Sequence, residues 1–369
     1  MIDCGHYSSE IQYHVEKNLE KHIDLLIVTH IDNDHLDGLV EMLDITPDIV
    51  IDKILYNCNQ LWDGRSARAQ SESISHDIEI IRRNLPQSRK ELFGKVKADK
   101  AITLAESIAM KEIWWEAWKK DKYVTSSTEP LLVDEVDQRF GKLIFLTPIK
   151  DSIEKLNYLF KAEQVRLTKH IIENSGYLDG QEALFELVQR VVAVKRNNYR
   201  IDEPEKAGAG MLGETSIIKA HEFKPQSVSD ENTASIAFVW EFENKRVLFM
   251  GDAEPDEVAD ALDRVYGNQS LVFEAIKVSH HGSKHSTSDR LLHYIDSDHY
   301  FFTGGNRKDK PSLEAIIKIV DRGDDKVRIL HMNNHVNEVV ECLNSEEGKA
   351  IREKYHFGIS YINEHSFEY

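Results

Sequence analysis

The sequence has few cysteines, no long apolar run and a shortage of positive charge. Its three cysteines, Cys4, Cys58 and Cys342, lie far apart and form no CxxC pair. They fit reduced, mostly buried thiols better than a disulfide framework. No apolar run approaches the roughly 18 residues that a membrane span needs, and no signal peptide is visible at the N-terminus. Together these absences favour a soluble, cytoplasmic protein with no membrane partner.

Acidic residues outnumber basic ones in this chain of 369 residues. Asp and Glu number 64, Lys and Arg number 46, and the net charge is −18. This balance opposes a protein that binds nucleic acid with its whole surface, although it allows a local basic patch. The length admits either two average domains or one large α/β domain with insertions.

The chain is organised around residues 29–38, THIDNDHLDG, which directly follow the aliphatic run DLLIV at 24–28. Such a run predicts a buried strand. Four potential metal ligands lie within six residues after it: His30, Asp32, Asp34 and His35. Because a strand end is rigid, these side chains can converge on one point. Imidazole and carboxylate in alternation suit zinc, manganese or iron.

A second interpretation of the same stretch is an acidic turn that only caps a helix beginning near Leu36. Asp and Asn do favour N-cap positions. Capping needs a single residue of this kind, however, and leaves both histidines unexplained.

Residues 29–38 resemble the signature of the metallo-β-lactamase superfamily, HxHxDH at the end of a buried strand, with Asp32 in place of the second histidine. This variant looks like the metallohydrolase domain of the ComEC-type DNA-uptake proteins and their stand-alone relatives. Three further stretches resemble that branch in type and order: MIDCG at 1–5, RVLFMGDA at 246–253 and IKVSHHGS at 276–283.

The resemblance implies an α/β (α+β) fold, the four-layer αββα sandwich of the superfamily, as a single domain over 1–369. Segments 64–140 and 150–215, which have helical patterns, would be insertions, the first forming a lid. In the family a β-hairpin precedes the strand at residues 1–5. Here either the true start lies upstream or the first sheet has lost its outer strands. The open sheet edge would then pair with a second copy or a partner chain.

The resemblance also implies the ligands of a centre for one or two divalent ions, zinc or manganese. The expected ligands of the first ion are His30 and Asp32, those of the second ion are Asp34, His35 and His280, and Asp252 bridges the two. Asp34 and Asp252 are the expected catalytic residues. The residues expected to hold a ligand imidazole, orient a loop or face the substrate are Asp3, Asn232, His281 and Ser283. Because neighbours on a strand face opposite sides, only one of His280 and His281 can face the metal, and the resemblance favours His280.

Two positions depart from the family pattern. Thr147 ends the strand-like run at 142–147, where the wider fold has a metal-binding histidine, and Lys310 replaces the histidine of a His-Pro-Ser sequence. A hydroxyl is a far poorer ligand than an imidazole. We therefore expect the first ion to be held more loosely than the second.

The activity implied by the resemblance is hydrolysis of a phosphodiester in a nucleic acid or nucleotide, by a hydroxide that the ions generate near neutral pH. One alternative is hydrolysis of a small ester, thioester or lactam. Another is a catalytically weak binding or assembly subunit, which the departures at Thr147 and Lys310 motivate. Seven basic residues within 82–100 either recruit a phosphate-rich substrate or form an ordinary solvated face.

Overall fold

The computed structural model describes residues 1–57, 104, 108, 123–132, 141–156, 214–225, 229–305, 307–333 and 337–361. The chain divides into two compact units, Met1–Tyr123 with Asp151–Ile201, and Val124–Lys150 with Asp202–Tyr369. The expected insertions 64–140 and 150–215 lie mostly outside the described residues, and the basic run 82–100 lies entirely outside them. The single domain, the lid and the second insertion stay predictions.

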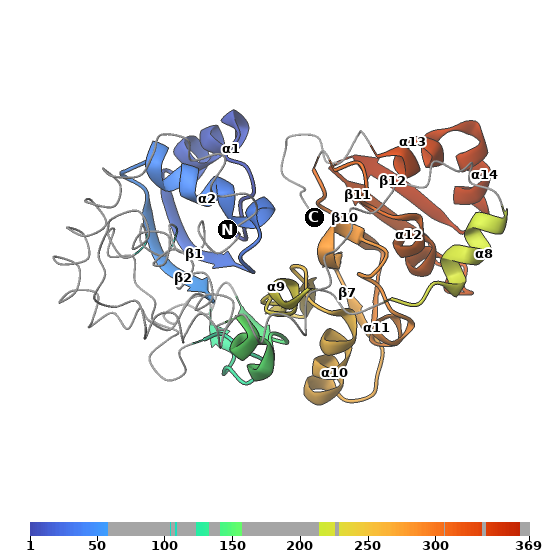
Figure 1. Cartoon of the computed structure of the whole chain (residues 1–369), viewed down its shortest axis with the longest axis horizontal. Coiled ribbons are helices and arrows are strands. Elements are labelled where there is room, and N and C mark those ends of the chain that lie inside the picture. The colour runs from blue at the N-terminus through green and yellow to red at the C-terminus, as the bar shows by residue number, and fades with distance from the viewer. Residues whose placement is uncertain are drawn as a thin grey trace, which may run out of the picture. The chain divides into compact units, whose positions relative to one another are not determined.

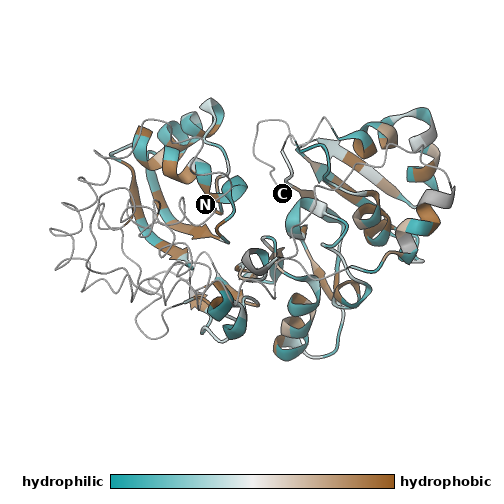
Figure 2. Cartoon of the chain, in the orientation of Figure 1, coloured by the Kyte–Doolittle hydropathy of each residue, from teal (hydrophilic) through white to brown (hydrophobic). Residues whose placement is uncertain are grey.

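In the first unit, two parallel strands, β1 (His22–Val28) and β2 (Val50–Tyr56), are connected by helix α2 (Asn33–Ile45) (Figure 1). They follow a short helix, α1 (Ser9–Tyr13), that continues into a π-helical turn, His14–Asn18. The last three residues of β1 are buried, and Figure 2 shows hydrophobic residues along this strand. On its other side β1 forms a parallel bridge, Ile2 to Ile27. The buried end of β1 therefore has neighbours on both sides and provides a rigid base for the motif that follows.

The second unit contains a mixed sheet whose eight strands follow the order β12-β11-β10-β8-β6-β5-β4-β3. Their bounds are β3 Leu131–Leu132, β4 Lys142–Phe145, β5 Phe238–Phe242, β6 Lys245–Phe249, β8 Ala275–Lys277, β10 His299–Phe302, β11 Arg328–Met332 and β12 Phe357–Tyr361. Strands β12, β11, β10, β8 and β6 are parallel to one another. The pairs β6 with β5, β5 with β4, and β4 with β3 are antiparallel. A separate parallel pair is formed by β7 (Leu271–Phe273) and β9 (Ile295–Ser297).

Helices cover this sheet and bury an aliphatic and aromatic core. Their bounds are α8 Glu214–Glu222, α9 Asp230–Thr233, α10 Pro255–Tyr266, α11 Asp289–Tyr294, α12 Leu313–Val320, α13 Glu338–Asn344 and α14 Glu346–Lys354. Helix α8 lies against α12, and α10 against α11. Figure 2 shows both hydrophobic and hydrophilic residues around α10, whose buried residues include Val258 and Leu262. The core combines these with strand residues such as Ile276, Tyr300 and Phe302.

The sheet order brings several loops to one edge of the second unit. Strands β6, β8 and β10 are neighbours and parallel, so their carboxyl ends meet at the same edge. Strand β4 also runs in this direction, because two antiparallel steps through β5 separate it from β6. The loops that follow these four strands carry Asp252, His280, Thr303 and Thr147. This edge positions the functional residues of the unit.

The described structure is a mixed α/β arrangement, in agreement with the class expected from the sequence. The apolar runs of the motifs at 29–38, 246–253 and 276–283 correspond to strands β1, β6 and β8, whereas Ile2 in the motif at 1–5 forms an isolated bridge. The strand expected at 142–147 is β4, which ends at Phe145, two residues before Thr147. Among the described residues, no helix is long and apolar enough to cross a membrane.

Candidate functional site

The residues of the first motif lie where β1 ends and α2 begins. His30 and Asp32 belong to the short connection, and Asp34 and His35 to the first turn of α2. The exposed fractions of His30, His35 and Asp32 are 2%, 3% and 9%, whereas Asp34 is exposed. Asp32 occupies the N-cap position, yet its side chain makes no capping hydrogen bond. The capping interpretation is therefore not supported. We call His30, Asp32, Asp34 and His35 the N-terminal ligand set.

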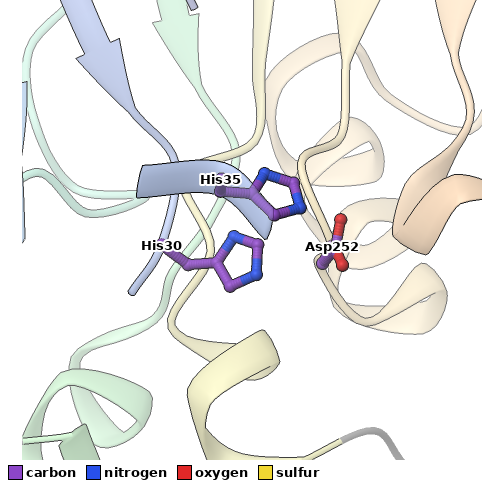
Figure 3. A group of neighbouring side chains, drawn as sticks. All are labelled: His30, His35 and Asp252. Carbon is purple, nitrogen blue, oxygen red and sulfur yellow. The ribbon is translucent and has the colours of Figure 1, made fainter. Parts of the chain in front are cut away.

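The imidazoles of His30 and His35 lie side by side, with ring centroids 4.1 Å apart (Figure 3). Nδ1 of His35 lies 2.7 Å from Oδ2 of Asp3, and Nδ1 of His30 lies 3.1 Å from the hydroxyl of Thr29. That hydroxyl donates to Oδ2 of Asp3 at 2.7 Å, and the Thr29 N–H donates to Oδ1 at 2.7 Å. Both ring Nδ1 atoms therefore face acceptors and carry the proton. Both Nε2 atoms are left as the ligating atoms.

Asp3 was expected to hold a ligand imidazole, and it is placed to do so. Burial alone would raise its pKa, but the neighbouring imidazoles, His35 foremost, and its hydrogen bonds keep the pKa below the usual value. The carboxylate therefore stays ionised and remains an acceptor. The backbone around it is closely docked on α2: Cys4 N–H donates to the carbonyl of His35 at 2.8 Å. A Cβ on Gly5 would lie 1.9 Å from the carbonyl oxygen of Asp34, so only glycine fits there.

The spacing between donor atoms in this set fits a metal ion. Nε2 of His30 lies 3.9 Å from Oδ2 of Asp32, which is too long for a hydrogen bond. Two ligands bound to one ion at roughly 2 Å each are about 3 to 3.5 Å apart. A ring nitrogen of His35 also lies within 4.8 Å of one from His30, and of a carboxylate oxygen of Asp34. The donor set is therefore one that could hold a metal ion.

Asp252 is the centre of a second group of donors, in the other unit. It follows β6, is 2% exposed, and its N–H donates to the hydroxyl of Ser235 at 2.9 Å. Its Oδ2 lies 3.8 Å from Nε2 of His280 and 3.7 Å from Nε2 of His281. These separations again exceed a hydrogen bond and approach the spacing of two ligands on one ion. We call Asp252, His280 and His281 the C-terminal ligand set.

His280 and His281 do not lie on a strand, so the expectation that only one of them can face the metal is not supported. Strand β8 ends at Lys277, and His280 and His281 lie in a 3-10 turn, Ser279–Gly282, with left-handed φ angles of 46° and 56°. Both rings therefore approach Asp252 together. Holding a non-glycine residue in this region costs on the order of 1–3 kcal/mol, and such strain occurs at functional sites. His280 as the ligand stays a prediction, with His281 equally placed.

Further residues support the C-terminal ligand set. Nδ2 of Asn232 lies 3.5 Å from Nε2 of His280, and Nδ1 of His281 lies 3.3 Å from the hydroxyl of Thr303. Ser283 is 1% exposed, and its hydroxyl accepts the N–H of His285 at 3.2 Å, which makes it part of the turn. Lys310 is buried, and its Cβ and that of His281 both lie close to Gly304.

The hydrogen bonds of Thr147 give its side chain a structural role that does not involve a metal ion. Its hydroxyl donates to the carbonyl of Ser235 at 2.7 Å and accepts the N–H of Ala237 at 3.0 Å. The side chain is completely buried. Because the single hydroxyl proton is already donated, Thr147 serves to tie β4 to the segment before β5. Ser235, in turn, receives the N–H of Asp252.

Among the described residues, no role was predicted from the sequence for Thr29, Lys277 and Thr303, whose side chains contact the ligand sets. Lys277 was detectable in principle, since a charge inside the apolar run AIKV is unusual. The two threonines gave no signal, because threonine is common in and next to strands for its packing alone.

Comparison with known proteins adds no relative to this picture. No protein-family model matches the chain. No curated protein matches it either. The four motifs and the geometry around them therefore carry the functional argument. The expected meeting of the two ligand sets in one centre stays a prediction.

Proposed function

We propose that this protein is a metal-dependent phosphodiesterase of the metallo-β-lactamase type, with the αββα sandwich of that superfamily. The observation that carries the proposal is the pair of buried imidazoles, His30 and His35. Each has its Nδ1 facing an oxygen acceptor, the two rings lie side by side, and Nε2 of His30 lies 3.9 Å from Oδ2 of Asp32. A carboxylate that holds a histidine from behind is typical of metal ligands, because it fixes the tautomer and raises the basicity of the ring.

The proposed ligands of zinc or manganese are His30, Asp32, Asp34, His35 and Asp252, with His280 or His281. By the resemblance, both ligand sets serve the same pair of ions. Bound divalent ions would lower the pKa of water and polarise a phosphoryl oxygen. Asp3 and Thr29 keep both imidazoles in the ligating tautomer. The burial of His30, His35 and Asp252 keeps bulk water from these donors, which strengthens their electrostatic interactions.

The substrate class that we propose is a phosphodiester in a nucleic acid or nucleotide. Its support is the resemblance to the ComEC-type branch and the basic run 82–100 within an acidic chain. Asp34 and Asp252 are the proposed catalytic residues, by the same resemblance. We place the protein in the cytoplasm, where the free thiol of Cys4, buried and with a pKa raised to about 11, would stay reduced.

The test starts from protein dialysed against a chelator and resupplied with manganese or zinc. Metal content is measured beside hydrolysis of bis(p-nitrophenyl) phosphate, single-stranded DNA and RNA, and an ester, a thioester and a lactam. We expect metal-dependent cleavage of the phosphodiesters, lost in His35→Ala and in Asp252→Ala. His293→Ala is the matched control, since His293 lies in α11, where its ring lies 2.9 Å from Oδ1 of Asn268 and packs against the ring of Tyr294. It should behave as the wild type.

Three results would contradict the proposal. Phosphodiester cleavage that persists after complete removal of metal would exclude the role of the ligand sets. Turnover of only the ester, thioester or lactam would assign the other hydrolase class. Tight metal binding with no turnover on the whole panel would favour an assembly subunit.

A further inference from the structure

Lys277 is a charged residue in the middle of the eight-stranded sheet. It ends β8, between Phe249 of β6 and Phe301 of β10. Its side chain is 16% exposed. An ammonium group is costly to bury unless partners compensate it. The position therefore calls for partners that hold the charge.

Those partners belong to the loop that carries Asp252. The ammonium donates to the carbonyl of Gly251 at 2.6 Å and lies 3.5 Å from Oδ1 of Asp252. The same carbonyl accepts the N–H of His280 at 3.1 Å. Gly251 itself has a left-handed φ of 49°, which turns its carbonyl back toward β8. The carbonyl of Gly251, in the turn after β6, is thus bound by Lys277 at the end of β8 and by His280 in the turn after β8.

The two oxygens of Asp252 have different surroundings within this unit. Oδ1 lies beside the ammonium of Lys277, whereas Oδ2 lies beside the Nε2 atoms of His280 and His281. A carboxylate without a fixed neighbour rotates about its last bond, since that torsion is broad. A cation anchored on one side removes this freedom. The orientation of Oδ2 toward the histidines then follows from the position of Lys277.

We propose that Lys277 is a positioning residue that fixes the carboxylate of Asp252, holding Oδ1 and so directing Oδ2 to the metal. This inference rests on the proposed function, because it concerns how Asp252 serves as a ligand. The ammonium also repels a bound cation. If the proposal holds, the gain in metal affinity from orienting Asp252 exceeds the loss from this repulsion. Whether removal of the lysine weakens or strengthens metal binding is therefore a direct test.

The test uses two variants of the full-length protein. Lys277→Met removes both contacts, and Lys277→Gln keeps a donor for Gly251 while removing the charge beside Asp252. The dissociation constant for zinc is measured by competition with a chromophoric chelator, and cobalt is substituted to record its visible spectrum. We expect both variants to bind zinc about 10- to 100-fold more weakly, as is usual when a partner of a ligand is lost. We also expect an altered cobalt spectrum in both.

The matched control is Lys326→Met. Lys326 is also ion-paired, 3.0 Å from Asp296, and it precedes β11 at the amino ends of the parallel strands. It should bind zinc as the wild type does. Thermal unfolding of the metal-free proteins shows whether each variant folds. If Lys277→Met does not fold, Lys277→Gln decides, because it retains the donor to the loop.

The outcomes separate this inference from the proposed function. Wild-type affinity and spectrum in folded Lys277 variants would overturn the role of Lys277 and leave the proposed function standing. Tighter zinc binding would also overturn it, because repulsion would then be the main effect of the lysine. A wild-type protein that binds no zinc would overturn both.

Discussion

The two ligand sets hold their histidines by different means. In the N-terminal set, side chains orient the rings: Asp3 accepts from His35, and Thr29 contacts His30. In the C-terminal set, the backbone does so, since the left-handed turn at His280 and His281 brings both rings toward Asp252. Loss of a supporting side chain should therefore have unequal effects in the two sets. It should disturb the orientation of the histidine rings far more in the N-terminal set than in the C-terminal set.

The largest effect is expected inside the N-terminal ligand set, between Asp32 and Asp34. In the proposed centre the second ion would have Asp34, His35, His280 and Asp252 as ligands. The first ion, with Asp32, would lack the histidine that the resembled family has at the position of Thr147. We expect Asp34→Ala to abolish metal binding and activity. Asp32→Ala should mainly raise the manganese concentration required for half-maximal activity after dialysis.

This difference between the aspartates also predicts unequal occupancy. One ion should remain bound after mild chelation, and the other should be lost and recovered on addition of metal. Two ions that survive chelation together in the purified protein would contradict it and would imply a ligand outside the residues named here.

The second prediction compares the partners of the rings directly. Asp3 accepts three hydrogen bonds at 2.7 Å, two from Thr29 and one from His35. Thr303 makes one contact of 3.3 Å with His281. We expect Asp3→Ala to lower zinc affinity by about 10- to 100-fold, and Thr303→Val to leave it close to the wild-type value. Chelator competition measures both. Equal losses in the two variants would mean that side chains, not the backbone, orient both sets.

The sequence predicted those strands that leave a pattern over a few neighbouring residues. The run at 24–28 was recognisable because a buried strand is aliphatic, and the donors after it were recognisable by their chemistry. Strand β6 was recognisable in the same way, whereas Asp252 was singled out by the family resemblance. The mixed α/β class was expected from the same resemblance. The strand order from β12 to β3 could not be predicted, because it depends on pairings between distant segments.

The turn at His280 and His281 shows a second limit. A run such as IKVSHHGS predicts a strand, and strand alternation then places the two rings on opposite sides. The structure ends β8 at Lys277 instead, and Gly282 packs against the ring of Phe302, where a Cβ would lie only 2.4 Å from Cδ1. Because Gly282 and Phe302 are 20 positions apart in the chain, no local sequence pattern predicts this close approach.

Thr147 supplies the third prediction, with the smallest effect. Its position next to Ser235 and Ala237 depends on the pairing of β4 with β5, which no local pattern reveals. The hydroxyl is buried and used both as donor and as acceptor. Thr147→Val would leave the Ser235 carbonyl and the Ala237 N–H without this partner. We expect a loss of about 1–3 kcal/mol in the free energy of unfolding, measured by urea denaturation of the metal-free protein.

Thr147→Ser is the matched control for this prediction. Serine keeps the hydroxyl, so its stability should lie nearer to that of the wild type, and its zinc affinity should be unchanged. The measurement also sharpens the comparison between the two sets, because Ser235 connects Thr147 to the N–H of Asp252. If the C-terminal set is held by its backbone, Thr147→Val should lose stability and retain most of its zinc affinity. A loss of zinc binding in Thr147→Val that Thr147→Ser does not share would instead make the threonine hydroxyl a ligand, and the interpretation of Thr147 as a tie between strands would be wrong.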